Sequence, residues 1–263
     1  MYSNNLLKSV KANAVCKAFG IKITPGAQVV QLAHNAGFDA LFIDLEHGWL
    51  SLDDTTTLCN VAHLVGITPF VRVPHQCGNG FVQRVLDGGA MGVFFPHIDA
   101  PEDAQKAVAI SKYPPQGCRS ITGQIPLFGM RSTPPTDMIR LTNESGSTVF
   151  LMIESGAGSA RADEIAQVPG VDAIVMGTQD LAVDLGVPGQ LDHLSVKGAL
   201  EQVSKACATH GKIFGIAGIY GNAALQEWAI NTLGARFLLT QQDTSALFAA
   251  GAQAVKAVPA VKP

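Results

Sequence analysis

The chain contains 263 residues, of which 47% are hydrophobic and 15% are charged, and it carries a formal net charge of −3. This composition supplies a large apolar core and excludes a disordered chain, while the lack of any run of Lys or Arg gives no electrostatic footprint for nucleic acid or an anionic membrane. Because no segment has the length of a membrane span and the first residues lack the pattern of a cleaved leader, we expect a cytoplasmic protein.

Short apolar runs alternate with helical patterns along most of the chain. Uninterrupted apolar runs are typical of parallel strands that are covered on both faces. Helix-start signals follow the first two runs: Pro25 opens one helical segment, and Ser51 with two acids opens the next. We predict strands at residues 14–23, 40–47, 68–73, 91–96, 148–153, 172–176, 212–217 and 236–240.

Two segments stand apart from this alternation. Residues 111–147 interrupt it with prolines, an apolar-aromatic loop and a polar turn. A long insertion of this kind in a barrel is usually functional, so we expect a functional role for it. After the last predicted strand, residues 244–258 read as an apolar helix that needs a partner surface.

Eight strand–helix units predict an α/β protein with a single (β/α)₈ barrel, the TIM barrel fold, spanning residues 1–263. An open doubly wound sheet is the alternative, but such a sheet is expected to carry a Gly-rich nucleotide-binding turn after its first strand. The one near match, at residues 156–161, has Arg161 where the third glycine of that turn should stand. We therefore favour the barrel.

The fifth and sixth predicted strands each lead to a carboxylate, Glu154 and Asp180. Neighbouring parallel strands that are joined through a helix end at the same edge of a sheet, so these two side chains should meet there. Converging carboxylates repel unless one is protonated or a cation lies between them, and oxygen ligands suit Mg²⁺ or Mn²⁺. We predict a metal site at this pair. The alternative is that both acids cap the helices that follow them.

Other predicted strands also deliver polar side chains to this edge, where barrel enzymes carry their chemistry. His47 and His97 end the second and fourth strands, and Arg72 ends the third. Arg72 stands among apolar neighbours and therefore needs an anionic partner, for which its planar fork suits the carboxylate or oxo oxygen of a 2-oxo acid. Asp44 and Glu46 share one face of the second strand, where they either hold metal-bound waters or form salt bridges to a neighbouring helix.

Asp87 ends the third predicted helix, and it either orients His47 or is simply a helix-terminal acid. An imine-forming enzyme would instead need a desolvated lysine inside the barrel. The sixth strand contains no lysine, and Lys17 and Lys22 on the first strand are the candidates inside a strand. The pattern therefore favours metal-assisted chemistry over covalent imine chemistry.

Seven short motifs occur in order along the chain: IDLEH, VRVP, RVLDGGA, PHIDAPEDA, YPPQGCRS, MIES and GTQDLAVDLGVPGQLDH. Together they resemble the HpcH/HpaI aldolase family of class II pyruvate aldolases, from about residue 11 to residue 250. The resemblance implies an enzyme that depends on Mg²⁺, Mn²⁺ or Co²⁺ and makes or breaks a carbon–carbon bond through a pyruvate enolate. It also implies a homo-oligomer, a hexamer, with the C-terminal helix packed on a neighbour.

The resemblance also implies roles for individual residues. The stretch Gly177-Thr178-Gln179-Asp180 differs from the G-P-N/A-D common among these aldolases, and it is more like the branch that includes macrophomate synthase. By motif, Glu154 and Asp180 are the metal ligands, Arg72 holds the 2-oxo acid, His47 is the acid/base, Asp87 is its partner, and Thr178 and Gln179 contact the substrate.

Three functions remain open at this point. The leading one is reversible aldol cleavage of a 4-hydroxy-2-oxo acid to pyruvate and an aldehyde. The second is decarboxylation of oxaloacetate to the same enolate, with or without its capture by another electrophile, as in macrophomate synthase. The third is a non-catalytic barrel that serves as a binding or assembly protein. Retention of all four predicted mouth residues argues against the third: His47, Arg72, Glu154 and Asp180.

Overall fold

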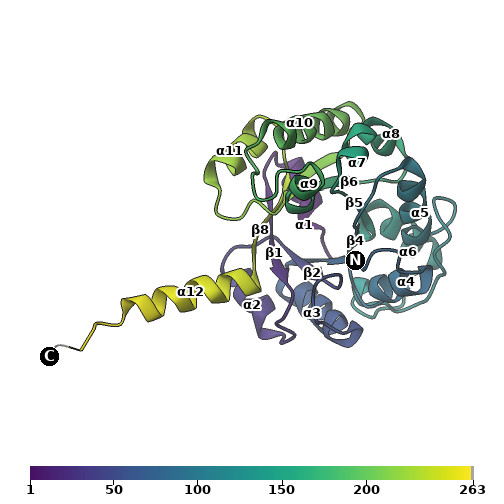
Figure 1. Cartoon of the computed structure of the whole chain (residues 1–263). Helices are drawn as coiled ribbons and strands as arrows, with labels where there is room; N and C mark the ends of the chain where they lie inside the picture. Colours follow the sequence, from purple (N-terminus) through teal and green to yellow (C-terminus); the bar gives the residue numbers. More distant parts are fainter. Residues whose placement is uncertain (262–263) are drawn as a thin grey trace.

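The computed structural model describes residues 1–261, which form a closed barrel of eight parallel strands surrounded by helices (Figure 1). Each strand pairs with the next one in the sequence, and β8 (Phe237–Gln242) pairs with β1 (Cys16–Ile21) to close the ring. The predicted (β/α)₈ barrel is therefore confirmed. The other strands are β2 (Ala40–Asp44), β3 (Thr68–Arg72), β4 (Gly92–Phe95), β5 (Thr148–Ile153), β6 (Ala173–Gly177) and β7 (Ile213–Ala217).

Helices cover the outside of the barrel. The best-defined start is that of α3 (Leu52–Val65), where Ser51 and Asp54 form a reciprocal capping box. The remaining helices are α1 (Asn5–Lys11), α2 (Gln28–Asn35), α4 (Asn79–Asp87), α5 (Pro101–Ser111), α6 (Pro135–Leu141), α7 (Gly156–Ala160), α8 (Ala162–Gln167), α9 (Thr178–Asp184), α10 (Leu194–Thr209), α11 (Ala223–Asn231) and α12 (Asp243–Ala257), with a 3₁₀ turn η1 (Pro126–Phe128) and a π-helical turn η2 (Thr142–Gly146).

Aromatic rings fill the inside of the barrel. Phe94 stacks on Phe150 with the ring centroids 3.9 Å apart, and Phe70 contacts Phe150 edge-on at 4.8 Å. Phe42 and Phe237 belong to the same buried cluster. Because this interior is a packed core, ligands have to bind above it, at one end of the barrel.

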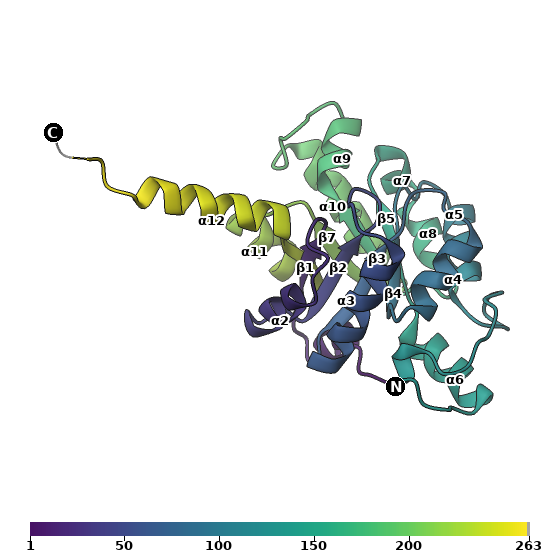
Figure 2. The ribbon, with the colours of Figure 1, turned by 90° about the horizontal axis from the view of Figure 1, so that it is seen from below.

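The later part of the segment at residues 111–147 lies at the N-terminal end of the barrel, together with the start of the chain (Figure 2). Asn4 donates through Nδ2 to the hydroxyl of Thr148, the first residue of β5, at 3.0 Å. The backbone N–H of Tyr2 donates to the carbonyl of Leu127, whose side chain is buried in the cluster inside the barrel. This part of the segment therefore closes the end of the barrel opposite the C-terminal ends of the strands.

Helix α12 points away from the barrel and carries the chain end with it (Figures 1 and 2). Its one buried residue is Asp243, at its start. Large apolar side chains lie open along it, with Leu247 61% and Phe248 79% exposed. In residues 1–261, no helix has both the length and the apolar character required to cross a membrane.

Candidate active site

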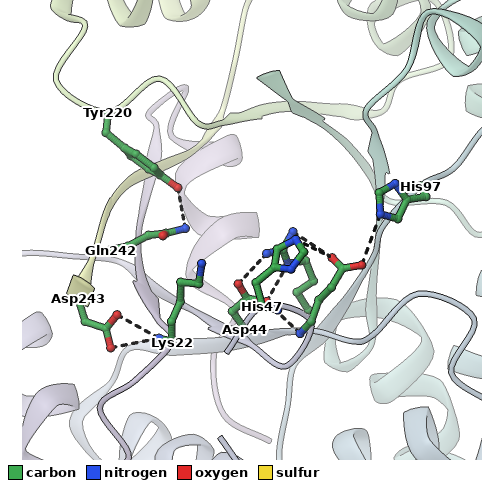
Figure 3. A network of polar contacts seen from close by, with 9 residues as sticks. Lys22, Asp44, His47, His97, Tyr220, Gln242 and Asp243 are labelled. Carbon is green, nitrogen blue, oxygen red and sulfur yellow. Dashed lines mark hydrogen bonds and ion pairs between the residues drawn. The ribbon is translucent and has the colours of Figure 1, made fainter. Parts of the chain in front are cut away.

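A polar cavity of about 300 Å³ opens at the C-terminal ends of the strands. Side chains from strands on opposite sides of the barrel reach it, because parallel strands all end at the same rim. Figure 3 shows His97 on one side of this mouth and Tyr220 and Gln242 on the other. Of the seven residues predicted to act in catalysis, substrate binding or metal binding, six line the cavity: His47, Arg72, Glu154, Thr178, Gln179 and Asp180.

Arg72, the last residue of β3, is only 6% exposed and is held by two acids from the second strand and the loop after it. Its Nε and Nη2 atoms donate to the two carboxylate oxygens of Asp44 at 2.9 and 2.6 Å. Its Nη1 atom lies 3.1 Å from Glu46 Oε2. Of the two alternatives for Asp44 and Glu46, the structure shows salt bridges. Their partner is Arg72 on the neighbouring strand, whereas a helix was expected.

The charge on this pair is fixed by its contacts. Burial alone would raise the pKa of Asp44, but its hydrogen bonds and ion pair with Arg72 bring the pKa below its ordinary value. Burial would likewise lower the pKa of Arg72, and Asp44 more than offsets that, so the pKa is raised. Both groups are therefore charged at neutral pH, and the two-donor edge of the guanidinium is occupied before any ligand binds.

Glu154 follows β5 and is buried, with 4% of the residue exposed. Its Oε2 atom accepts a hydrogen bond from the backbone N–H of His97 at 3.0 Å, and the Nδ1 atom of His97 lies 3.5 Å from the same oxygen. A Cβ atom on Gly177 would overlap Glu154 Oε1, so the carboxylate has room only because residue 177 is a glycine. The end of β6 is therefore shaped around the Glu154 carboxylate.

Asp180 is exposed at the rim, in the first turn of α9. The two residues before it fasten this turn to the end of β7. The hydroxyl of Thr178 donates to the carbonyl of Ala217 at 2.9 Å, and the side-chain amide of Gln179 donates to the carbonyl of Gly218 at 2.8 Å. Both residues line the cavity, where they were predicted to contact the substrate. Their side-chain hydrogen bonds are made to the protein, and these bonds position Asp180.

The Glu154 and Asp180 pair fits a hard divalent cation. Both residues line the same cavity, and burial, with a smaller contribution from the negative charge of Asp180, raises the pKa of Glu154. In the described part of the chain no group of three or more His, Cys, Asp and Glu side chains could hold a metal ion. A site of one or two carboxylates, completed by water and substrate oxygens, is the arrangement that Mg²⁺ usually takes.

His47 lies in the loop after β2, with its side chain 55% exposed. Its backbone N–H donates to Asp44 Oδ1 at 3.2 Å, and its Nε2 atom lies 4.0 Å from Glu46 Oε2. The backbone is thus fixed by a buried acid, while the ring stays free to turn toward a ligand in the cavity.

Asp87 is the one predicted site residue that the chain does not bring to this mouth. It ends α4, which runs antiparallel to the strands and so finishes near their N-terminal ends. Its carboxylate accepts a hydrogen bond from Nη2 of Arg119 at 2.7 Å, and it does not line the cavity. Within one chain, the prediction that Asp87 orients His47 is therefore not met, and the acids beside His47 are Asp44 and Glu46.

Three polar side chains of the cavity had no predicted role in binding or positioning a ligand: Lys22, Tyr220 and Gln242. Lys22 follows β1 and was considered only as an imine-forming candidate. Gln242 ends β8, two residues beyond the predicted end of that strand, and Tyr220 lies in the loop after β7. A longer eighth strand would have placed Gln242 at the rim, whereas the loop position of Tyr220 carries no periodic signal.

Comparison with known proteins gives a consistent result. Residues 25–228 match the family model described as HpcH/HpaI aldolase/citrate lyase. The chain is 48% identical over 261 residues to a 4-hydroxy-4-methyl-2-oxoglutarate aldolase of Hapsidospora irregularis, covering 99% of this chain and 97% of that one. It is 49% identical over 255 residues to an aldolase of the same description from Chaetomium globosum, covering 97% and 95%. A solved HpcH/HpaI aldolase from Desulfitobacterium hafniense has a TM-score of 0.90 at 29% identity, covering 99% of this chain and 100% of that one.

Proposed function

The chain belongs to the HpcH/HpaI aldolase/citrate lyase family, and from this premise we propose that it cleaves 4-hydroxy-4-methyl-2-oxoglutarate into two molecules of pyruvate. The predicted family is confirmed, and so is the predicted class of enzyme, a class II aldolase that breaks a carbon–carbon bond and releases pyruvate. The choice of substrate rests on two relatives of this description that match nearly the whole chain.

The chemistry of this substrate defines what the cavity must do. Cleavage breaks the bond between C3 and C4, and its electron pair passes to the C1–C3 fragment as the enolate of pyruvate. The C4 hydroxyl loses its proton and becomes the ketone of the second pyruvate, and a proton added at C3 completes the first. The second product of this substrate is thus a 2-oxo acid, whereas the general reaction predicted from the sequence releases an aldehyde.

Enzymes of this family depend on a metal ion. Glu154 and Asp180 would hold it, and Mg²⁺ is favoured over Mn²⁺ or Co²⁺ because the pair offers only carboxylate oxygens. A bound divalent cation would supply electrostatic stabilisation of the negative charge that develops on the 2-oxo acid. The observation that best supports this assignment is the buried Glu154 carboxylate in the space left by Gly177, with Asp180 lining the same cavity.

Arg72 and His47 would carry the remaining steps. Arg72 is a fixed positive charge on the wall of the cavity, and we assign its N–H groups that are not bonded to Asp44 to the carboxylate and oxo group of the 2-oxo acid. His47 would accept the proton of the C4 hydroxyl and supply a proton at C3, because it lines the cavity and an imidazole can both accept and donate a proton. Thr178 and Gln179 would position Asp180.

We also propose assembly into a homo-oligomer, a hexamer by family resemblance, and the C-terminal helix supports this proposal. An apolar groove of about 480 Å³ runs between α2 and the base of α12, with Val29, Leu32 and Phe38 on one wall and Leu247 on the other. Together with the exposed face of α12, it makes a surface on which a second copy of the chain would place its own helix.

Substrate comparison tests the proposed function. Purified enzyme with Mg²⁺ should release two pyruvates per 4-hydroxy-4-methyl-2-oxoglutarate, EDTA should abolish turnover, and added Mg²⁺ or Mn²⁺ should restore it. Borohydride in the presence of pyruvate should leave the chain unlabelled. Faster turnover of oxaloacetate than of this acid would favour decarboxylation as the native reaction, and a reduced adduct on any lysine would contradict the metal-enolate chemistry.

A further inference from the structure

The mouth of the barrel has two chemically different sides. One side carries four carboxylates, from β2, β5 and β6 and the turns that follow them. The other side, formed by the ends of β7, β8 and β1, carries an ammonium, a phenol and an amide, and Figure 3 shows these three groups facing the same space. The residues of the acidic side have roles in the proposed function. The residues of the other side have no role in it so far: Lys22, Tyr220 and Gln242.

Lys22 is held in place by its backbone. Its N–H donates to both oxygens of Asp243 at 3.1 Å, and its carbonyl accepts from the N–H of Trp49 at 3.0 Å. Asp243 is 2% exposed and also accepts hydrogen bonds from the backbone N–H groups of Ile23, Thr24 and Thr244. Its carboxylate is therefore satisfied by the backbone. The Lys22 side chain leaves this anchor and points into the mouth (Figure 3).

The ammonium of Lys22 is left for a ligand. In the mouth, Asp44 and Glu46 are already paired with Arg72, and in residues 1–261 no carboxylate forms a salt bridge with Lys22. Arg72, the other fixed cation of the cavity, has its two-donor edge occupied by Asp44. A second anionic group that entered the mouth would therefore be attracted to Lys22.

Tyr220 and Gln242 complete this side. The amide of Gln242 donates to the phenol oxygen of Tyr220 at 2.8 Å, so the phenol proton remains free to donate to a ligand. Burial raises the pKa of Tyr220, which keeps that proton in place at neutral pH. A Cβ atom on Gly20 would lie 2.7 Å from Cγ of Gln242, so the glycine in β1 makes the room in which the amide lies.

We propose that Lys22, assisted by the hydroxyl of Tyr220, binds the second carboxylate of the substrate, the one attached to the carbon that carries the hydroxyl group. This rests on the proposed function, in which that carboxylate leaves with the second pyruvate. The first carboxylate and the oxo group lie toward Glu154, Asp180 and Arg72, and a dicarboxylate would span the mouth to Lys22. The site thus selects an electrophile that is itself a carboxylic acid over an uncharged ketone or aldehyde.

Replacing Lys22 tests this selection. The ratio of kcat/KM for 4-hydroxy-4-methyl-2-oxoglutarate to kcat/KM for 4-hydroxy-4-methyl-2-oxopentanoate, where a methyl replaces the second carboxylate, should fall about 10- to 100-fold in Lys22→Met. Lys22→Arg keeps the charge and should retain most of the ratio. Lys17→Met, at the opposite end of the same strand, is the matched control and should leave the ratio as in the wild type.

Several results would overturn the inference. An unchanged ratio in Lys22→Met, an equal fall in Lys17→Met, or a borohydride-reduced pyruvate adduct on Lys22 would each do so. Failure of the proposed function would be distinguishable from these results, because the wild-type enzyme would then release no pyruvate from 4-hydroxy-4-methyl-2-oxoglutarate. In that case the aldol addition of pyruvate to glyoxylate, compared with acetaldehyde, gives the same ratio in the synthetic direction, and the same fall in Lys22→Met is expected.

Discussion

Arg72 meets two demands at once, because it neutralises the buried acid Asp44 and also faces the cavity. In Arg72→Lys the charge remains but the two parallel hydrogen bonds to Asp44 are lost. We expect the free energy of unfolding to fall by about 1–3 kcal/mol, since a buried carboxylate loses a partner, and oxalate affinity to fall at least about tenfold. Denaturant titration and calorimetry measure the two effects, with Arg84→Lys at an exposed position of α4 as control. Unaltered oxalate binding would show that Arg72 is purely structural.

His47 should matter only when a proton moves. His47→Ala should lower the rate of aldol cleavage by about 10²- to 10⁴-fold while leaving oxalate affinity near that of the wild type. Oxaloacetate decarboxylation should be largely spared, because loss of carbon dioxide supplies the electron pair of the enolate without a base. Steady-state kinetics on both substrates distinguish these outcomes, and His34→Gln on α2 is the control. Equal losses on both substrates would mean that His47 holds substrate or water instead.

The sequence predicted where most site residues lie but not which groups they contact. The rule that parallel strands finish at one edge was enough to bring His47, Arg72, Glu154 and Asp180 to one cavity. It did not reveal which anion satisfies Arg72, because a strand pattern gives the position of a side chain but not its partner. The distance between Asp87 and the cavity follows from the antiparallel run of α4, which a motif match does not take into account.

At the scale of strands and helices, the apolar runs located every strand, and β5 matches its predicted bounds at both ends. Burial on both faces leaves a continuous signal of this kind in parallel strands. Helix α1 was not predicted, because its seven residues are too short for a clear period and its stability depends on Asn4, which caps it and also bonds to Thr148. The position of residues 125–147 at the N-terminal end likewise depends on tertiary contacts, such as that between Tyr2 and Leu127.

The junction of β6 and α9 offers a test of the predicted metal site. Gly177→Ala would push a methyl group into Glu154 Oε1, so the carboxylate has to move. The backbone of Gly177 has a φ of −88°, which alanine tolerates, so strain of the main chain is not expected. We expect Mg²⁺ affinity, measured by calorimetry, to fall at least about tenfold. Gly198→Ala inside α10 is the control, since a Cβ there meets nothing within 4 Å and Mg²⁺ affinity should stay as in the wild type. Equal affinities in the two variants would remove Glu154 from the metal site.

At the scale of the whole molecule, the barrel is complete by itself except at α12, which has only Asp243 buried and presents Leu247 and Phe248 to solvent. Apolar side chains on a helix that projects from its own domain are expected to be covered by another copy of the chain. We therefore expect light scattering to find an oligomer at micromolar concentration. Phe248→Asp should shift the distribution toward smaller species, because a buried unpaired charge is costly at an interface.

Leu194→Asp supplies the matched control for this last prediction. Leu194 begins α10 on the body of the barrel and is 84% exposed, so it is as apolar and as open as Phe248 but lies on another helix. The same substitution there should leave the molar mass unchanged. A loss of assembly in both variants would point to a general effect of added charge, and a monomeric wild-type protein would mean that α12 has no partner in solution. Pyruvate release measured on the separated species would then tell whether a single barrel, with its own Glu154, Asp180 and Arg72, is sufficient for catalysis.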